Sequence, residues 1–383
     1  MIAARSARAT SSPGYAITTL SALGAEARAW DALSARAGDA HPFYGRHVMQ
    51  AHAESGLASP DLSILVVRGP GRIEALLPFR ISYDICGLGR PVALPFVSPF
   101  ITATAPLVAA GPERPAILAT LVEGLREASG GRPWRWPLLA SDALGRDLMA
   151  AMAAAGWAQG EVARFARPVL DRRVDHEAFL EGHPHRARLK DLRRRRRRLA
   201  EGGTVTHAVA TGGPALAEAR EAFLALEAAG WKGEAGSAMA CRPAHATFAR
   251  ALFAETAGPV RVRADTLRLD GRVLAVSLAL LSGGTAYLLK TAYDEAARAQ
   301  APGLILEAEI VRALHDDAFA ERLDSATTGD CVLESLYRER ETVVEVVAVP
   351  GGGRHVVSLD QRLRLARLEG EARGEVKRLL RRR

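Results

Sequence analysis

The clearest pattern in the chain is a change of hydrophobic period near residue 290. Residues 285–291 (TAYLLKT) alternate with the period of two that is typical of a β-strand. A polar loop follows, and apolar residues then recur with helical spacing from Pro302 to Asp317, where proline is favoured in the first turn. A helix this apolar must pack against a sheet. Its N-terminus directs unpaired N–H groups and a partial positive charge towards the strand end, which predicts a phosphate-binding position.

Hydrophobic periodicity and turn signals predict one order of elements, β-α-α-β-β-β-α-β-α-β, in both halves of the chain. In the first half the predicted strands are 15–20, 62–68, 73–81, one or two within 92–109, 134–140 and 157–170, and the predicted helices are 26–37, 45–56, 115–128 and 142–155. A helix over 184–201 opens the second half. The later strands are 204–210, 260–269, 272–281, 285–291, 322–326 and 343–349, and the later helices are 215–229, 242–257, 302–317 and 330–338.

This repeat of element order predicts two lobes, 14–172 and 173–352, followed by a basic tail over 353–383. The Asp270-Gly271 pair between two apolar runs is a strong hairpin signal within the second lobe. The tail is helical in pattern and is expected to be an exposed helix or a frayed end. The 383 residues are enough for two domains of ordinary size.

Composition favours a soluble globular protein, because 48% of the residues are hydrophobic and 25% are charged. The histidines form no H-x-x-x-H or HExxH pattern and the 3 cysteines have no metal or redox spacing, so we expect no metal site and reduced, cytoplasmic thiols. Residues 1–13 contain no apolar core and do not resemble a signal peptide. Residues 91–112 carry no charge, but prolines divide them, which favours buried strands over a transmembrane helix.

Positive charge is concentrated in two places. The formal net charge is +8, and Arg186–Arg198 and Arg362–Arg383 carry much of it. The consecutive arginines Arg193–Arg198 cover all faces of the predicted helix, which fits either a solvated helix or contact with a polyanion such as CoA, RNA or an anionic lipid surface. The aromatic residues of a typical RNA-binding platform do not accompany the run, so nucleic acid is not the expected partner.

The loop before the helix at Pro302 carries a family resemblance. Gln300-x-x-Gly303-x-Ile305 resembles the Q/R-x-x-G-x-G/A loop with which GNAT N-acetyltransferases grip the pyrophosphate of acyl-CoA, with Ile305 in place of the final Gly or Ala. The segments LLKTAYDE (288–295) and GWKG (230–233), with Asp324 and Gly329-Asp330, are similar to the CelD-type branch found in polysaccharide gene clusters. That branch is related to Fem-type aminoacyltransferases, which contain two GNAT-like folds.

The resemblance covers roughly 175–350 and implies a fold class and a donor. It implies tandem GNAT-like domains, each with a mixed, mostly antiparallel sheet flanked by helices. The second would be catalytic, and the first, which keeps only 110–112 as a remnant of a phosphate loop, would shape the acceptor groove. The donor would be acetyl-CoA or another acyl-CoA, held by Arg298, Gln300, Gly303 and Leu304.

Acyl transfer also needs a donor for the thioester carbonyl and a base for the acceptor. The candidate catalytic residues are Lys290, Tyr293, Asp294, Glu227 and Tyr337. Lys290 ends an apolar strand and must reach water, an anion or a carboxylate; the alternative is a lysine that snorkels to the surface. Asp294 and Glu227 are alternative bases, although Asp294 also fits a loop cap. Tyr293 could donate to the carbonyl, and Tyr337 lies on the element that carries an acidic tyrosine in many GNAT enzymes.

Three residues are candidates for binding the acceptor, and they are Trp231, Lys232 and Asp324. In GNAT folds the connection that holds GWKG lines the acceptor groove, so Trp231 could serve as a lid. The alternatives are that Trp231 closes the core and that Asp324 is a structural cap.

The sequence therefore predicts a cytoplasmic acyl-CoA-dependent N- or O-acyltransferase that acts by direct transfer on a small-molecule, sugar or polysaccharide-precursor acceptor. Two alternatives remain open. One is a Fem-type transferase that uses aminoacyl-tRNA and binds RNA through the arginine helix. The other is a non-catalytic GNAT scaffold in a polysaccharide assembly.

Overall fold

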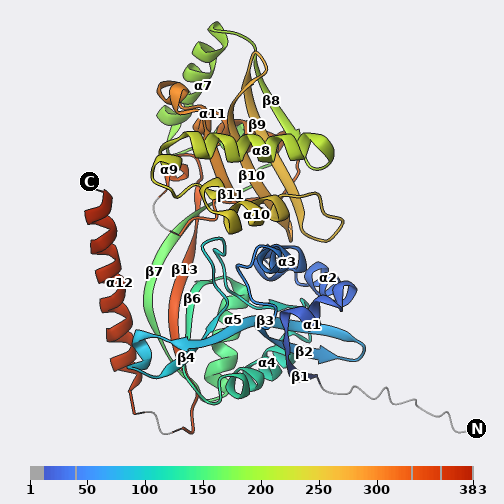
Figure 1. Cartoon of the computed structure of the whole chain (residues 1–383), viewed down its shortest axis with the longest axis vertical. Helices are drawn as coiled ribbons and strands as arrows, with labels where there is room; N and C mark the ends of the chain where they lie inside the picture. Colours follow the sequence, from blue (N-terminus) through green and yellow to red (C-terminus); the bar gives the residue numbers. More distant parts are fainter. Residues whose placement is uncertain (1–12, 39–40, 329–330, 354–355, 382–383) are drawn as a thin grey trace, which may run out of the picture.

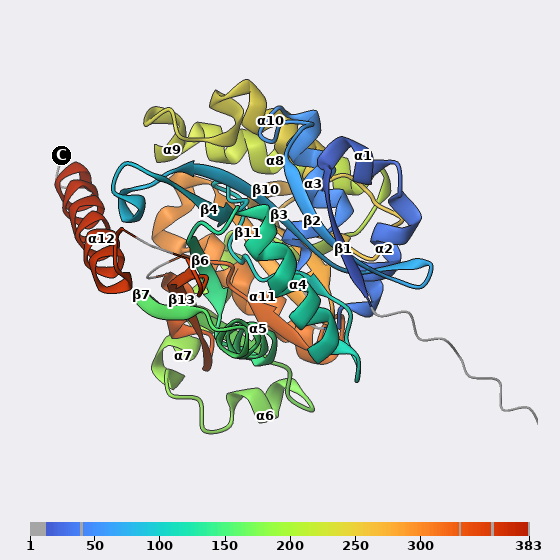
Figure 2. The ribbon, with the colours of Figure 1, turned by 90° about the horizontal axis from the view of Figure 1, so that it is seen from below.

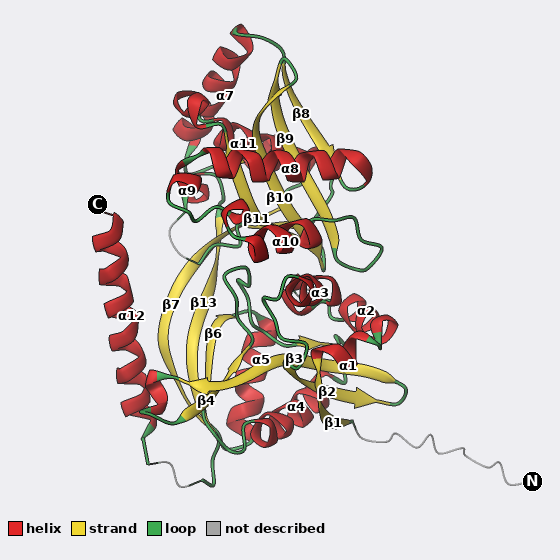
Figure 3. Cartoon of the chain, in the orientation of Figure 1, coloured by secondary structure: helices red, strands yellow, loops and turns green. Residues whose placement is uncertain are grey.

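The strands of both halves join into one continuous sheet (Figures 1 and 3). The structure is a computed structural model that describes residues 13–38, 41–328, 331–353 and 356–381. The strands of the first half are β1 (Gly14–Thr19), β2 (Ser63–Gly69), β3 (Arg72–Tyr83), β4 (Pro91–Pro95), β5 (Leu107–Val108), β6 (Trp134–Ala140) and β7 (Ala158–Asp171). Those of the second half are β8 (Val205–Ala210), β9 (Arg261–Leu269), β10 (Arg272–Ser282), β11 (Thr285–Tyr293), β12 (Arg322–Asp324) and β13 (Glu339–Val349).

Two strands exchange places at the centre of the sheet, whose order is β1-β2-β3-β4-β6-β13-β7-β12-β11-β10-β9-β8. β7 comes from the first half but pairs with β12, whereas β13 comes from the second half and pairs with β6. β7 and β13 also pair with each other, from Ala158↔Val349 to Val169↔Glu339. Each half therefore needs a strand of the other half inside its own part of the sheet. The division of the chain at residue 172, directly after β7, stays a prediction.

The predicted fold class is confirmed, because the sheet is mixed, mostly antiparallel and flanked by helices. Among the described residues, the parallel pairs of neighbouring strands are β4–β6 and β11–β12. The predicted hairpin is also present: Asp270 and Gly271 join β9 to β10 with φ values of 47° and 81°. Two successive positive φ values are characteristic of the tight turn that suits antiparallel strands.

The helices of the second half cover both faces of its strands (Figure 2). They are α6 (His176–Leu180), α7 (Arg186–Glu201), α8 (Gly213–Ala229), α9 (Trp231–Glu234), α10 (Pro243–Leu252) and α11 (Pro302–Asp316). Alternate residues of β10 face opposite cores. Ala275 and Ala279 pack in the cluster that contains α7 and α11, whereas Val276 and Leu278 pack in the cluster that contains α8 and α10. The sheet thus separates an α11 face from an α10 face.

The helices of the first half pack against β1–β6 around a large apolar core. They are α1 (Leu20–Gly24), α2 (Ala27–Arg36), α3 (Arg46–Glu54), α4 (Arg114–Ala128) and α5 (Ala143–Ala154). Trp134 and Trp136 of β6 are fully buried and stack at a centroid distance of 5.5 Å. Their indole N–H groups donate to the carbonyl oxygens of Leu125 and Thr104.

Several local predictions require correction. The tail forms α12 (Leu359–Arg381), which is neither frayed nor fully exposed: Leu363 and Ala366 are buried against β7 and β13, and Arg362 donates to the carbonyl of Cys86 at 2.7 Å. Apolar residues at helical spacing gave the tail one buried stripe despite its high charge.

Other corrections concern element ends. The predicted GWKG loop forms the one-turn helix α9, the predicted helix over 242–257 ends at Leu252, and the predicted helix over 330–338 is a single turn, η5 (Val332–Ser335). Gly329 and Asp330 lie outside the described residues.

Candidate functional site

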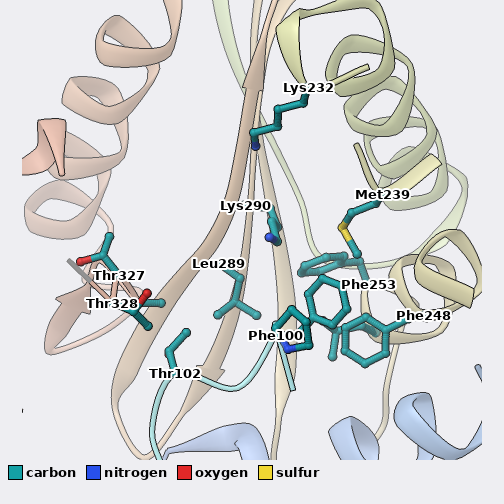
Figure 4. Close-up of a pocket in the computed structure, with 13 residues that line it drawn as sticks. Phe100, Thr102, Lys232, Met239, Phe248, Phe253, Leu289, Lys290, Thr327 and Thr328 are labelled. Carbon is teal, nitrogen blue, oxygen red and sulfur yellow. The ribbon is translucent and has the colours of Figure 1, made fainter. Parts of the chain in front are cut away.

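The two parallel strands of the second half separate and open a cavity. β11 and β12 pair from Thr285↔Arg322 to Tyr287↔Asp324, and their ladder ends there. A cavity of about 800 Å³ lies beyond this point. Its walls come from β11, from 326–328 after β12, from α9 and α10, and from a first-half loop over 96–106 (Figure 4). We call this cavity the interlobe cleft.

A β-bulge shapes the β11 wall of the cleft. In the ladder with β10, Leu278 pairs with Lys290 and Ala279 pairs with Leu288, so Leu289 is the extra residue. A bulge leaves its extra residue outside the ladder and bends the strand. Leu289 lines the cleft, and its backbone is therefore a candidate for contact with a ligand.

Lys290 brings a mostly buried positive charge into the cleft. Its ammonium nitrogen lies 5.2 Å from the centroid of the Phe100 ring, and no hydrogen bond or ion pair joins it to another described residue. Burial lowers the pKa of Lys290, and the neighbouring charge of Lys232 lowers it further, while Glu227 acts in the opposite direction. Sequence reasoning selected this lysine, and the structure places it at the bulge.

Lys232 and Glu227 form an ion pair at the rim of the cleft. The ammonium of Lys232 donates to Glu227 at 2.8 Å, and the other carboxylate oxygen of Glu227 accepts the backbone N–H of Met239 at 2.8 Å. The Glu227 side chain is buried, and both its oxygens are engaged. Trp231 is 60% exposed and lines a small neighbouring cavity with this pair, and its role as a lid stays a prediction. The predicted residues Glu227, Trp231 and Lys232 thus come together close to Lys290.

An aromatic wall that the sequence analysis did not select faces the lysines (Figure 4). Phe248 of α10, with Phe253 just after it, stands beside Phe100 of the first-half loop, and the rings of Phe100 and Phe248 stack with centroids 4.5 Å apart. Phe100 lies in the uncharged, proline-rich segment that we expected to be buried strand. The signal that could have found it is the concentration of proline around the two phenylalanines of this segment, Phe96 and Phe100, which disfavours a regular strand.

Arg167 of β7 ties together the floor of the cleft. Its guanidinium donates to the carbonyl of Thr327 at 2.9 Å and to that of Thr102, and it lies 3.5 Å from the Asp324 carboxylate. Asp324 also accepts the backbone N–H of Ala326 at 2.6 Å. The predicted acceptor residue Asp324 therefore braces the loop after β12, and it lines a neighbouring cavity of about 360 Å³ together with Arg167.

The predicted phosphate loop offers one free N–H group. Ala301 has φ 57° and begins α11; its carbonyl accepts the N–H groups of both Leu304 and Ile305 at 3.1 Å. Pro302 has no N–H, so Gly303 alone retains a free donor in this first turn. An added Cβ at Gly303 would lie 3.3 Å from the Tyr293 ring.

The remaining predicted residues of this region lie around η4 (Glu295–Gln300), a 3₁₀ turn between β11 and α11. Arg298 and Gln300 are exposed on it, and Leu304 is half-buried at the start of α11. Asp294 caps η4 by accepting the N–H of Ala296 at 2.9 Å and pairs with Arg272. Tyr293 lines a small cavity of about 80 Å³ that Lys232 and Trp231 share.

Tyr337 forms a hydrogen bond with a buried carboxyl group. Its buried hydroxyl donates to Glu307 of α11 at 2.6 Å, on the α11 face of the sheet. Burial raises the pKa of Glu307 to about 7. The role of Tyr337 as an acid stays a prediction, and its hydroxyl is not among the groups that line the interlobe cleft.

The arginine helix borders the predicted phosphate loop. Arg195 of α7 donates to the carbonyl of Ala299 in η4 at 2.7 Å. Asp191 pairs with Arg194 and Arg195, while Arg193, Arg197 and Arg198 are exposed. Part of the predicted polyanion surface is thus neutralised within the protein, and the rest is exposed.

Two kinds of feature are absent from the described residues. No helix there is long and apolar enough to span a membrane. No group of three or more His, Cys, Asp or Glu side chains there is arranged to hold a metal ion.

Most of the cleft lining comes from the second half of the chain, and the loop over 96–106 of the first half supplies the remaining wall. Residues 186–330 match the family model of the acetyltransferase (GNAT) domain. No curated protein matches the sequence.

Solved structures with a similar fold share little sequence with this chain. FemX is 11% identical with a TM-score of 0.55, over 84% of this chain and 95% of FemX. A tandem GNAT protein from the clavulanic acid biosynthesis pathway is 16% identical with a TM-score of 0.43, over 89% of this chain and all (100%) of that protein. The C-terminal domain of a putative lysylphosphatidylglycerol synthetase from Agrobacterium fabrum is 15% identical with a TM-score of 0.45, over 77% of this chain and 84% of that domain. At these identities the likeness concerns the fold alone.

Proposed function

We propose that this protein is an acyltransferase that moves an acyl group from a CoA thioester to an acceptor amine in the interlobe cleft. The observation that carries the proposal is the separation of β11 and β12 at the Leu289 bulge, which opens the cleft within the segment that matches the GNAT domain. The donor is acetyl-CoA or another acyl-CoA. A cytoplasmic location and an acceptor from polysaccharide synthesis, as in the CelD-type branch, belong to this proposal and rest on the sequence resemblance.

The chemistry of the lining favours an amine over a hydroxyl. Among the described residues that line the cleft there is no carboxylate, and Glu227 behind them is engaged by two donors. A hydroxyl needs a base before it attacks a thioester, whereas a neutral amine does not. The amine nitrogen bonds to the carbonyl carbon, the carbon–sulfur bond breaks, and the proton lost by nitrogen passes to the departing thiolate. The backbone N–H of Leu289 is the proposed donor to the carbonyl oxygen in this step.

The phosphates of CoA would lie at the start of α11. There the Gly303 N–H and the helix dipole provide a favourable position for an anion, and Arg298 adds charge. Melting of the purified protein with acetyl-CoA tests the proposal. A ligand at 100 times its dissociation constant stabilises a protein by about 2.7 kcal/mol, which shifts the melting temperature by several degrees. Lack of a shift with any acyl-CoA, together with lack of turnover, would contradict the proposal.

A second candidate donor is aminoacyl-tRNA. The observation that favours it is the combination of Pro302, which removes an N–H from the phosphate loop, with the arginine helix that contacts the same loop through Arg195. Bulk tRNA in the same melting experiment separates the two donors. A shift with tRNA and not with CoA, weakened by salt, would favour the Fem-type alternative. A response to neither ligand would favour the non-catalytic scaffold.

A further inference from the structure

The interlobe cleft has an unbalanced charge. Its described lining contains two ammonium groups, those of Lys232 and Lys290, and no carboxylate. The rest of the lining is apolar or hydroxyl-bearing, with the three phenylalanines on one side and Thr327 and Thr328 on the other (Figure 4). A cavity of this composition attracts anions and repels cations.

The two lysines differ in how their charges are balanced. Lys232 is neutralised by Glu227 at 2.8 Å. Lys290 has the Phe100 ring at 5.2 Å and no carboxylate in contact among the described residues. A cation held mostly out of water without an opposite charge costs free energy, and the face of one aromatic ring offsets only part of that cost. Lys290 is therefore the group in the cleft that gains most from an anionic ligand.

We propose that the acceptor amine carries an anionic group, a carboxylate or a phosphate, which binds the Lys290 ammonium while an apolar portion of the acceptor packs on Phe100 and Phe248. This inference rests on the proposed function, because it names the class of acceptor for the same cleft. Anions also favour the positive edge of an aromatic ring, so a headgroup at Lys290 fits beside these side chains.

The position of Lys290 assigns the anionic group to the acceptor and not to the donor. The proposed site for the CoA phosphates is at Gly303, which lies against Tyr293 at the start of α11. Lys290 instead contacts Phe100, whose ring stacks on Phe248 of α10. The two anion positions thus have different neighbours: Gly303 lies against Tyr293 at the end of β11, whereas Lys290 lies against the aromatic wall.

The test uses matched probes that need no turnover. Binding of 3-phenylpropionate, 3-phenylpropylphosphonate and the neutral 3-phenylpropionamide to the full chain is measured by calorimetry at pH 7. We expect at least one anionic probe to bind about tenfold more tightly than the amide, which corresponds to one charge-assisted contact. Lys290→Met should remove this preference, and Lys290→Arg should keep most of it. Lys190→Met, at an exposed position of α7, is the control that should change nothing.

Several outcomes would overturn the inference. They are equal binding of the amide and the anions, a preference that survives Lys290→Met in a variant with a normal melting transition, and failure of both anionic probes to bind at millimolar concentration. Competition between CoA and the anionic probe would also overturn it, because the anion position would then belong to the donor. A selective anion site in a protein that binds no acyl-CoA would instead reject the proposed function and leave the Lys290 site standing.

Discussion

The two lobes have similar orders of elements and use them in opposite ways. In the second lobe β11 and β12 separate after three pairs, and the space between them is the interlobe cleft. In the first lobe the corresponding strands, β4 and β6, share only the single pair Ala93↔Trp134 among the described residues, but the stacked, buried rings of Trp134 and Trp136 fill the interior beside them. The first lobe then contributes Phe100 to the cleft of the second. The second lobe thus keeps an opening beside its parallel strands. In the first lobe side chains fill the corresponding space, and this lobe provides one wall of the interlobe cleft.

Substitution of a tryptophan in the closed lobe should have the largest effect on stability. Trp136→Ala removes a fully buried indole and its hydrogen bond to Thr104, and we expect a loss of about 3–5 kcal/mol in the free energy of unfolding. Leu289→Ala, in the open lobe, removes a partly buried side chain and should cost much less. Denaturant titration measures both. Similar losses from the two variants would contradict the assignment of one lobe as closed and the other as open.

Substitution of Arg167, which lies where the two lobes meet, should reduce stability nearly as much. Arg167→Met leaves the buried Asp324 carboxylate without its cation and frees two carbonyls, at an expected cost of about 3 kcal/mol. Arg164→Met on the same strand removes an exposed ion pair with Glu161 and should change the stability little. If the two variants had the same melting temperature, Arg167 would not stabilise the contact between the lobes.

A buried carboxyl group in the second lobe should make stability depend on pH. Glu307 stays protonated to about pH 7 in the folded chain, because burial raises its pKa from the ordinary value of 4.5. Between these pH values the unfolded chain binds fewer protons than the folded chain, so stability falls as the pH rises. Glu307→Gln should reduce this fall by about 1–3 kcal/mol. Unfolding curves from pH 5 to 8 provide the measurement, and Glu341→Gln is a necessary companion because burial also raises the pKa of Glu341 to about 7.

The smallest expected change is in the affinity for the donor. It tests whether the second lobe, and not the first, binds acetyl-CoA. Gly303→Glu places a negative charge at the start of α11 and a side chain against Tyr293, so the dissociation constant for acetyl-CoA should rise at least about tenfold. Gly303→Ala should weaken binding less. Arg114→Glu, at the start of the corresponding helix α4, should leave the constant unchanged. An equal effect of Arg114→Glu would show that the first lobe also binds the donor.

Local chemistry explains which predictions from the sequence agree with the structure. The Asp270-Gly271 hairpin, the helix that begins at Pro302 and the arginine helix have signals within a few residues, and all three are present. The exchange of β7 and β13 joins residues about 180 positions apart in sequence and leaves no local pattern. For the same reason Phe100 was not selected, because its contact with Phe248 depends on the packing of one lobe against the other.

Some features of the candidate site could likewise be predicted from the sequence, and others could not. Lys232 lines the interlobe cleft with Lys290 and a smaller cavity with Glu227 and Trp231, and the roles of these four residues stay predictions. The engagement of Asp294 by Arg272 and of Tyr337 by Glu307 could not be predicted, because each partner lies at least 20 positions away in sequence. The Leu289 bulge was equally hidden, since alternation of side chains along 285–291 gives no indication of which residue leaves the ladder.

The exchange of β7 and β13 has a consequence for the order in which the protein folds. During synthesis the first lobe is made long before β13, so β6 and β7 emerge with unpaired edges until residue 339 has left the ribosome. Such edges are prone to pair with other chains. Because the central ladder joins residues so distant in sequence, its closure is expected to be a late and slow event. The nascent protein therefore needs its last strand to complete its first lobe, and a chain that stops before β13 should aggregate even though most of both lobes is present.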